Sequence, residues 1–117
     1  MSGMAYKQMD IVLLPFPYSD LSVSKKRPAL VISNDEFNAS TPDLICCLIT
    51  TNLKQDKYSV GIDEQDVENG KLFFKSKVKP YRVFTTDSKI ILKKLCSLKQ
   101  QKFAQVIKNL HKITSIN

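Results

Sequence analysis

The apolar positions of this 117-residue chain fall into short runs separated by polar turns, a pattern typical of strands. Residues 9–16 are apolar on both alternating faces, which predicts a strand buried on two sides. Residues 17–26 are rich in Pro, Ser, Asp and Lys and predict a loop. A second strand is predicted over 27–33, where Pro28 keeps the preceding Arg27 extended. Residues 34–42 form a polar break.

Three further strands are predicted over 44–51, 58–62 and 77–85. The first is an apolar run that turns polar at Thr50, Thr51 and Asn52, and the other two alternate with period two. Pro80 predicts an edge or a bulge in the last of them, because proline cannot donate to a strand ladder. An acidic stretch precedes it and closes at the turn signal Asn69-Gly70. Residues 90–92 fit either a last strand or the start of a helix.

The end of the chain predicts one amphipathic helix. Ser97 and Gln100 have the spacing of a capping box, and apolar residues follow at 103, 106, 107, 110 and 113 on one helical face. We therefore expect a mainly β fold with a C-terminal helix, in which a small antiparallel barrel-like sheet packs against that helix. The length predicts a single domain over residues 1–117.

Charge is unevenly distributed along the chain. The formal net charge is +7, yet residues 1–70 hold six basic and ten acidic side chains, whereas residues 71–117 hold twelve basic side chains and only Asp87. This polarisation favours a polyanionic partner such as nucleic acid. A lysine-rich solvated helix is the alternative, but several of these lysines precede the predicted helix.

Several classes of site are disfavoured by the residue inventory. Cys46 and Cys47 are adjacent and Cys96 is distant, so a disulfide framework and a structural zinc site are disfavoured, and Cys46 and Cys47, which lie in an apolar run, are expected to be core side chains. The single histidine, His111, excludes two-histidine catalysis within one subunit, and three glycines cannot build a nucleotide-binding loop. No apolar run approaches the ~20 residues of a membrane span, so we expect a cytoplasmic protein without a membrane partner.

Two further groups of residues have both a functional and a structural interpretation. The carboxylates at 63, 64, 66 and 68 are more typical of a solvated turn than of a metal site. Aromatic side chains can stack on nucleobases, but on strands they usually belong to the core. Of the aromatic residues outside the predicted helix we expect Tyr18 and Tyr81 to be exposed; the others considered are Tyr6, Phe16, Phe73, Phe74 and Phe84.

One arrangement suggests phosphate chemistry. A strand that opens with Arg27 and another that closes near Thr50 are expected to bring a guanidinium and a hydroxyl to one rim of the sheet. Arginine binds phosphate oxygens bidentately, and a hydroxyl adds a further hydrogen bond. Lys77, Lys79 and Arg82 are expected to supply a basic wall beside them.

The order of these segments resembles the MazF/PemK-like toxin endoribonucleases of type II toxin-antitoxin systems. The resemblance begins with Met-Asp-Ile-Val-Leu-Leu-Pro-Phe-Pro-Tyr-Ser-Asp-Leu at 9–21 and Lys-Arg-Pro-Ala-Leu-Val-Ile-Ser-Asn at 26–34. It continues with Leu-Ile-Thr-Thr-Asn at 48–52, Ser-Lys-Val-Lys-Pro at 76–80 and Phe-Thr-Thr-Asp at 84–87. These segments span most of residues 9–95 in the family's order.

The resemblance implies an SH3-like barrel of the MazF/CcdB-like toxin fold, a homodimer and a cognate antitoxin that occludes the site. It implies cleavage of single-stranded RNA at preferred sequences, without metal or cofactor, by attack of the ribose 2′-OH on the adjacent phosphorus. The products are then a 2′,3′-cyclic phosphate and a 5′-OH, and DNA is inert. The family's catalytic arginine and threonine correspond to Arg27 and Thr50. The expected RNA-binding residues are Asp20, Lys25, Lys26, Thr51, Asn52, Ser76, Lys77, Lys79 and Arg82.

The chain departs from the family pattern at two places. Gln8-Met9 stands before Asp10 where many relatives have a glycine, and Lys79 replaces a frequent arginine. The alternative is a noncatalytic SH3-like binding module, or a degenerate toxin-like protein, that binds RNA or a protein partner.

Overall fold

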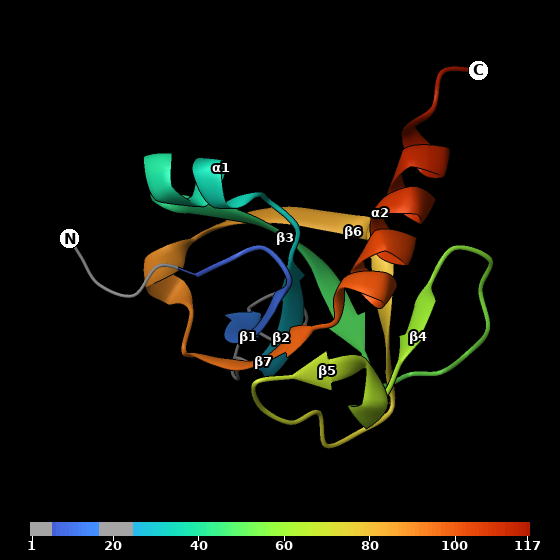
Figure 1. Cartoon of the computed structure of the whole chain (residues 1–117), viewed down its shortest axis with the longest axis horizontal. Coiled ribbons are helices and arrows are strands. Elements are labelled where there is room, and N and C mark those ends of the chain that lie inside the picture. The colour runs from blue at the N-terminus through green and yellow to red at the C-terminus, as the bar shows by residue number, and fades with distance from the viewer. Residues whose placement is uncertain (1–5, 17–24) are drawn as a thin grey trace.

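The computed structural model describes residues 6–16 and 25–117, in which seven strands form one curled antiparallel sheet (Figure 1). The strands are β1 (Asp10–Phe16), β2 (Lys25–Val31), β3 (Asp43–Thr50), β4 (Val60–Ile62), β5 (Val67–Glu68), β6 (Ser76–Asp87) and β7 (Lys93–Leu98). Their order across the sheet is β4-β6-β3-β2-β1-β7-β5. The helices are α1 (Asp35–Ser40), α2 (Gln100–Thr114) and the 3₁₀ turns η1 (Glu64–Asp66) and η2 (Ser88–Ile90). The predicted mainly β fold with a C-terminal helix is confirmed.

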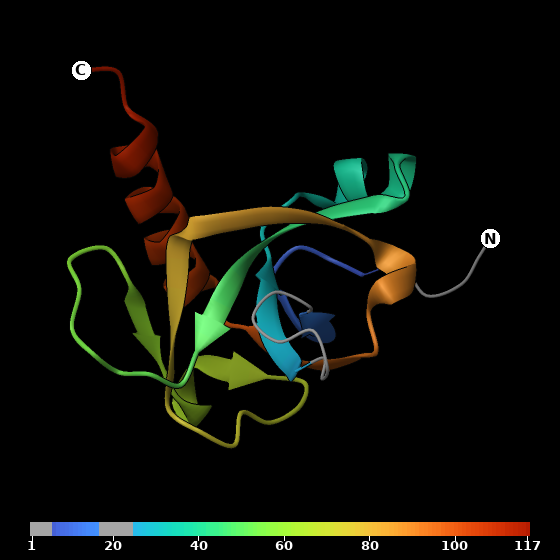
Figure 2. The ribbon, with the colours of Figure 1, turned by 180° about the vertical axis from the view of Figure 1, so that it is seen from behind.

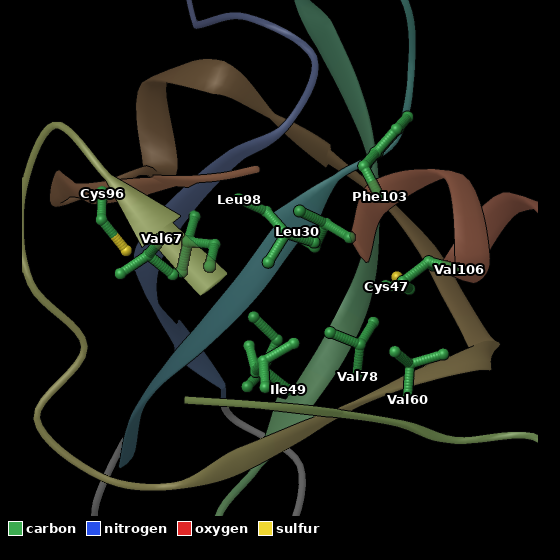
Figure 3. Packing of buried hydrophobic residues seen from close by; sticks show 12 residues of the cluster. Leu30, Cys47, Ile49, Val60, Val67, Val78, Cys96, Leu98, Phe103 and Val106 are labelled. Atoms are coloured by element: carbon green, nitrogen blue, oxygen red, sulfur yellow. The ribbon is translucent and has the colours of Figure 1, made fainter. Parts of the chain in front are cut away.

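Apolar side chains are buried on both faces of the sheet. On β1, Ile11 packs in one cluster and the next residue, Val12, in another, as expected for a strand covered on two sides. The first cluster lies between the sheet and α2, which contributes Phe103 and Val106 (Figure 3). The second cluster lies on the other face and includes Leu14 and Ala29.

Cys46 and Cys47 are buried, as predicted, and Cys96 is buried as well. Cys46 and Cys47 are consecutive on β3, so one side chain enters each core cluster. Burial raises the pKa of Cys46 to about 12 and that of Cys96 to about 11, and it raises the pKa of Cys47 as well. These thiols act as small core side chains.

Pro80 lies in a bulge, one of the two positions predicted for it. The register between β3 and β6 jumps from Cys47–Val83 to Leu48–Lys79, so residues 80–82 have no partner on β3. β4 pairs only with residues 76–78 of β6, so Pro80 has no partner strand on that side either, and the predicted edge position also holds. The bulge bends β6 sharply in the view of Figure 2.

Three predicted segments differ from the structure. The break at 34–42 contains α1, whose N-cap Asn34 accepts a hydrogen bond from the Phe37 amide (2.9 Å). An N-cap Asn followed by Asp35 and Glu36 is the sequence signal that the prediction overlooked. The predicted fourth strand begins at Val60 rather than residue 58, and Lys25 and Lys26 belong to β2 rather than the preceding loop.

The predicted capping box at Ser97 is wrong. Ser97 lies in β7, where it pairs with Asp10 and its hydroxyl donates to the Asp10 carboxylate (3.4 Å). Helix α2 begins at Gln100 after Lys99, which makes no side-chain cap. Residues 88–90 form η2 and residues 91–92 lead into β7, so neither alternative for 90–92 holds. No helix in the described part of the chain is both long and apolar enough to cross a membrane.

Candidate functional site

The register of the central strands aligns three of the predicted site residues. Strands β2 and β3 pair at Ala29–Leu48 and Leu30–Cys47, and strand alternation places Arg27 and Thr50, each two residues beyond the last pair, on one face of the sheet. Thr50 in turn pairs with Lys77 of β6. Directly opposed residues of neighbouring strands share one face of a sheet and lie ~5 Å apart. Arg27, Thr50 and Lys77 therefore form one row, which we call the polar row.

The polar row ends the face of the sheet that carries the second core cluster. Leu14, buried in that cluster, pairs with Arg27. Lys79 pairs with Leu48 one step further along the same face. Arg27 and Thr50 are both half-buried. The row thus presents polar groups at the rim of an apolar surface.

The Thr50 hydroxyl is oriented by the chain that follows it. Its oxygen accepts a hydrogen bond from the Asn52 amide (3.1 Å), and the Asn52 side-chain oxygen accepts one from the Lys54 amide (3.0 Å). A hydroxyl that accepts one hydrogen bond still has its own hydrogen to donate. Thr51 and Asn52 are exposed beside it.

Lys77 holds the loop that follows Thr50. Its ammonium donates to the Lys54 carbonyl oxygen and forms an ion pair with Asp56 (2.9 Å), and only 9% of its side chain is exposed. In this arrangement the Lys77 charge is directed to residues 54–56 and not to solvent.

The Asp56 carboxylate accepts several hydrogen bonds within this loop. It accepts from the Ser59 hydroxyl (2.6 Å) and from the amides of Tyr58 (3.1 Å) and Ser59 (2.8 Å). The Ser59 hydroxyl and the Lys77 ammonium hold the pKa of Asp56 well below its usual range. Asp56 was not predicted from the sequence, although Asp followed three residues later by Ser is a common turn signal.

The remaining predicted RNA-binding residues are placed less uniformly. Lys25 and Lys26 are exposed at the start of β2, two residues and one residue before Arg27. Ser76 is buried and its hydroxyl donates to the Phe74 carbonyl (2.9 Å). Arg82 is exposed within the bulge, where strand alternation does not assign it a face. Asp20 and Tyr18 lie outside the described residues.

Lys79 is half-buried and contacts Tyr81. Its ammonium lies 5.9 Å from the centroid of the Tyr81 ring, a cation–π distance. Tyr81 is 41% exposed, as predicted, and its hydroxyl donates to Asp56 (3.4 Å). This contact ties the bulge to the loop that Lys77 holds.

Other candidate chemistry is solvent-exposed or structural. His111 is exposed on α2. Asp63 caps η1 by accepting from the Gln65 amide, and Asp66 accepts from the Asp63 amide, which agrees with a turn. Within residues 6–16 and 25–117, no three His, Cys, Asp or Glu side chains are grouped to hold a metal ion.

Comparison with known proteins identifies the family. The family model described as "PemK-like, MazF-like toxin of type II toxin-antitoxin system" matches residues 7–114. A comparison with curated protein sequences finds no match.

Solved structures share the fold at low sequence identity. A MazE-MazF crystal structure from Deinococcus radiodurans superposes with a TM-score of 0.80 at 19% identity, covering 97% of this chain and 100% of that chain. An endoribonuclease in complex with its cognate antitoxin, from a mycobacterial species, gives a TM-score of 0.74 at 15% identity and covers 97% and 96%. The family match over residues 7–114 is consistent with the shared fold: this chain belongs to the PemK-like, MazF-like toxins of type II toxin-antitoxin systems.

Proposed function

We propose that this chain is an endoribonuclease toxin that cleaves single-stranded RNA at preferred sequences in the cytoplasm, without a metal ion. The observation that carries the proposal is the polar row, in which Arg27 of β2 and Thr50 of β3 lie on one face of the sheet, each two residues beyond the last paired residues of these strands. Family membership and the endoribonuclease named among the similar structures support it.

The proposed reaction is transfer of the phosphodiester to the ribose 2′-OH. The 2′-oxygen forms a bond to phosphorus while the bond to the 5′-oxygen of the next nucleotide breaks. The departing 5′-oxygen takes a proton from water, so that the products are a 2′,3′-cyclic phosphate and a 5′-OH. Negative charge accumulates on the phosphoryl oxygens in the transition state. Arg27 supplies a forked cation to those oxygens, and Thr50 donates one hydrogen bond from a hydroxyl that Asn52 orients.

Arg27 stabilises charge rather than moving protons, because a guanidinium stays protonated at neutral pH and is both a poor base and a poor acid there. The proton of the 2′-OH therefore goes to another group. We assign it to Asp20, with water as the alternative. An Asp20→Ala variant that retains full activity would exclude Asp20 as the acceptor of the 2′-OH proton.

The partner proposed for this toxin is a cognate antitoxin that covers the polar row, and the active form proposed is a homodimer. The similar structures include a MazE-MazF complex and an endoribonuclease bound to its antitoxin. Residues 71–117 carry twelve basic side chains and one acidic side chain, so an acidic antitoxin segment complements this half of the chain. Neutralising Lys25 and Lys26 together with the basic residues of β6 should weaken that complex.

The test incubates the purified protein with mixed-sequence single-stranded RNA in excess EDTA and identifies the product ends by mass. We expect cyclic phosphates from the wild type, a loss of about 10³-fold or more in kcat for Arg27→Ala and of about 10²-fold for Thr50→Val. Thr114→Val, on α2, is the matched control and should cleave normally. Folded protein that binds RNA but never cuts it would favour the noncatalytic alternative.

A further inference from the structure

Phe73 and Phe74 are adjacent and exposed. They lie in the connection 69–75 between β5 and β6, and 80% and 71% of their surface is accessible. The sequence analysis expected strand aromatics to be core residues, but this connection is not a strand. Isolated apolar side chains are common on protein surfaces, whereas a contiguous aromatic patch usually marks a binding site.

The connection that carries the two rings is anchored at both ends. Asn69 has a left-handed φ of 56°, and Gly70 packs against the backbone of Leu95 and Cys96 on β7. Leu72 packs against the first core cluster, and the Ser76 hydroxyl donates to the Phe74 carbonyl (2.9 Å). The rings therefore project from a fixed backbone, which lowers the entropy lost when a ligand binds.

Two lysines flank the rings. Lys71 and Lys75 are exposed, and neither forms an ion pair with any described residue. Residues 69–75 contain no carboxylate, although Lys75 lines a surface hollow together with Asp63 and Asp66. Planar apolar faces beside positive charge suit a ligand with stacked rings and phosphates, which is the chemistry of single-stranded nucleic acid.

The aromatic pair is close to the polar row. Phe74 precedes Lys77 by three residues, so their Cα atoms are at most ~11 Å apart. Lys77 pairs directly with Thr50. In Figure 2 the connection, coloured yellow, lies at the lower edge of the molecule, beside the end of β3. An RNA strand whose scissile phosphate sits at Arg27 and Thr50 therefore has flanking nucleotides within reach of the two rings.

We propose that Phe73 and Phe74, with Lys71 and Lys75, form a stacking subsite for bases of the RNA that flank the scissile phosphate. The inference rests on the proposed function for its ligand, but it concerns binding and not the cleavage step. The rings stack on bases without reading their edges, and the lysines neutralise adjoining phosphates. The subsite raises affinity for unpaired RNA over duplex, whose bases are stacked on one another.

The test measures binding of fluorescein-labelled, mixed-sequence single-stranded RNA by anisotropy, in an Arg27→Ala background that leaves the RNA intact. Phe74→Ala and Phe74→Leu should each weaken binding by about tenfold, and Phe74→Tyr should restore it, because tyrosine keeps the ring. Phe73→Ala and Phe73→Leu should weaken binding likewise. Ile116→Ala, which removes an exposed apolar side chain at the far end of the chain, is the control and should bind normally.

Two further measurements separate bases from phosphates. With an abasic strand of equal length, Phe74→Ala should bind as well as its parent. In a salt titration, Lys75→Gln should reduce the slope of log K against log salt by about 0.7, whereas Phe74→Ala should shift the line without changing its slope.

Three results would overturn the proposal: Phe74→Ala that binds RNA normally, Phe74→Leu that binds as tightly as its parent, or a change in oligomeric state of Phe74→Ala by sedimentation. The last would assign the rings to a protein interface. Failure of the proposed function is separate, because a protein that never cuts RNA but shows the ring dependence retains the subsite. Conversely, if the protein cuts RNA but replacing Phe73 or Phe74 does not change RNA binding, only the proposed subsite is refuted.

Discussion

Gly70 is a position at which the backbone admits no side chain. Its φ is +144°, and a Cβ there would lie 2.0 Å from the Leu95 carbonyl oxygen and 3.0 Å from the Cα of Cys96. The φ region alone costs an L-residue about 1–3 kcal/mol. Leu95 belongs to β7, which cannot retreat without disturbing its pairing with β1. We expect Gly70→Ala to lower the free energy of unfolding by about 3 kcal/mol or more, a large part of the roughly 5–15 kcal/mol of a typical domain.

Gly61→Ala is the matched control. Gly61 lies in β4, and no heavy atom lies within 4 Å of a Cβ built there. Replacement at such a position is neutral, or stabilising by about 0.4–1 kcal/mol. The assay is thermal unfolding followed by circular dichroism at one protein concentration. Gly70→Ala should lower Tm by about 10 °C or more, and Gly61→Ala should leave it unchanged or raise it slightly. A Tm for Gly70→Ala within ~2 °C of wild type would refute the steric argument.

Three other perturbations address the loop, the thiols and the helix. Because the pKa of Asp56 is lowered in the folded protein, its carboxylate stabilises the fold above the ordinary pKa of 3.8, and this contribution is lost as pH falls toward the folded pKa. Asp56→Asn should therefore make the free energy of unfolding, measured by urea titration, fall less steeply at acidic pH. An unchanged pH dependence would contradict this. The raised pKa values of the buried thiols predict a free energy of unfolding that is constant below the ordinary thiol pKa of 9.0 and declines as pH rises above it. Iodoacetamide should label these thiols only in urea. Rapid labelling of the native protein would contradict their burial. Val106→Ala removes two buried methyl groups from α2 and should cost about 2 kcal/mol in chemical denaturation, whereas a neutral effect would show that α2 contributes little to the core.

Local pattern was sufficient where one element is buried continuously. β1 and β3 were predicted nearly to their ends because apolar β-branched runs have few alternatives to a buried strand. The same logic predicted the apolar face of α2. Short elements were not predicted, because β5 has two residues and η1 has three, and segments of this length show no hydrophobic periodicity. The capping box at Ser97 was predicted wrongly because the Ser97 hydroxyl donates to Asp10, a residue 87 positions away, and not to a helix N-terminus.

For the candidate site, the sequence showed which residues can bind phosphate, but it did not show which residues lie beside them in the folded protein. Arg27 and Thr50 were singled out by residue type, position and family resemblance, and their alignment follows from a register that the sequence alone does not fix. Asp56 and its contact with Lys77 depend on a loop closing onto another strand 21 residues later. The exposure of Phe73 and Phe74 depends on what the rest of the chain leaves uncovered.

The sequence by itself therefore determined the strand-forming runs, the amphipathic helix, the charge polarity and the identities of the groups that can bind phosphate. Only the tertiary structure decided which lysine is buried in an ion pair, which aromatics face solvent and which polar residues share a row. The reason is physical: local propensity and burial period depend on a few neighbouring residues, whereas exposure and pairing depend on contacts among segments that the chain brings together from far apart.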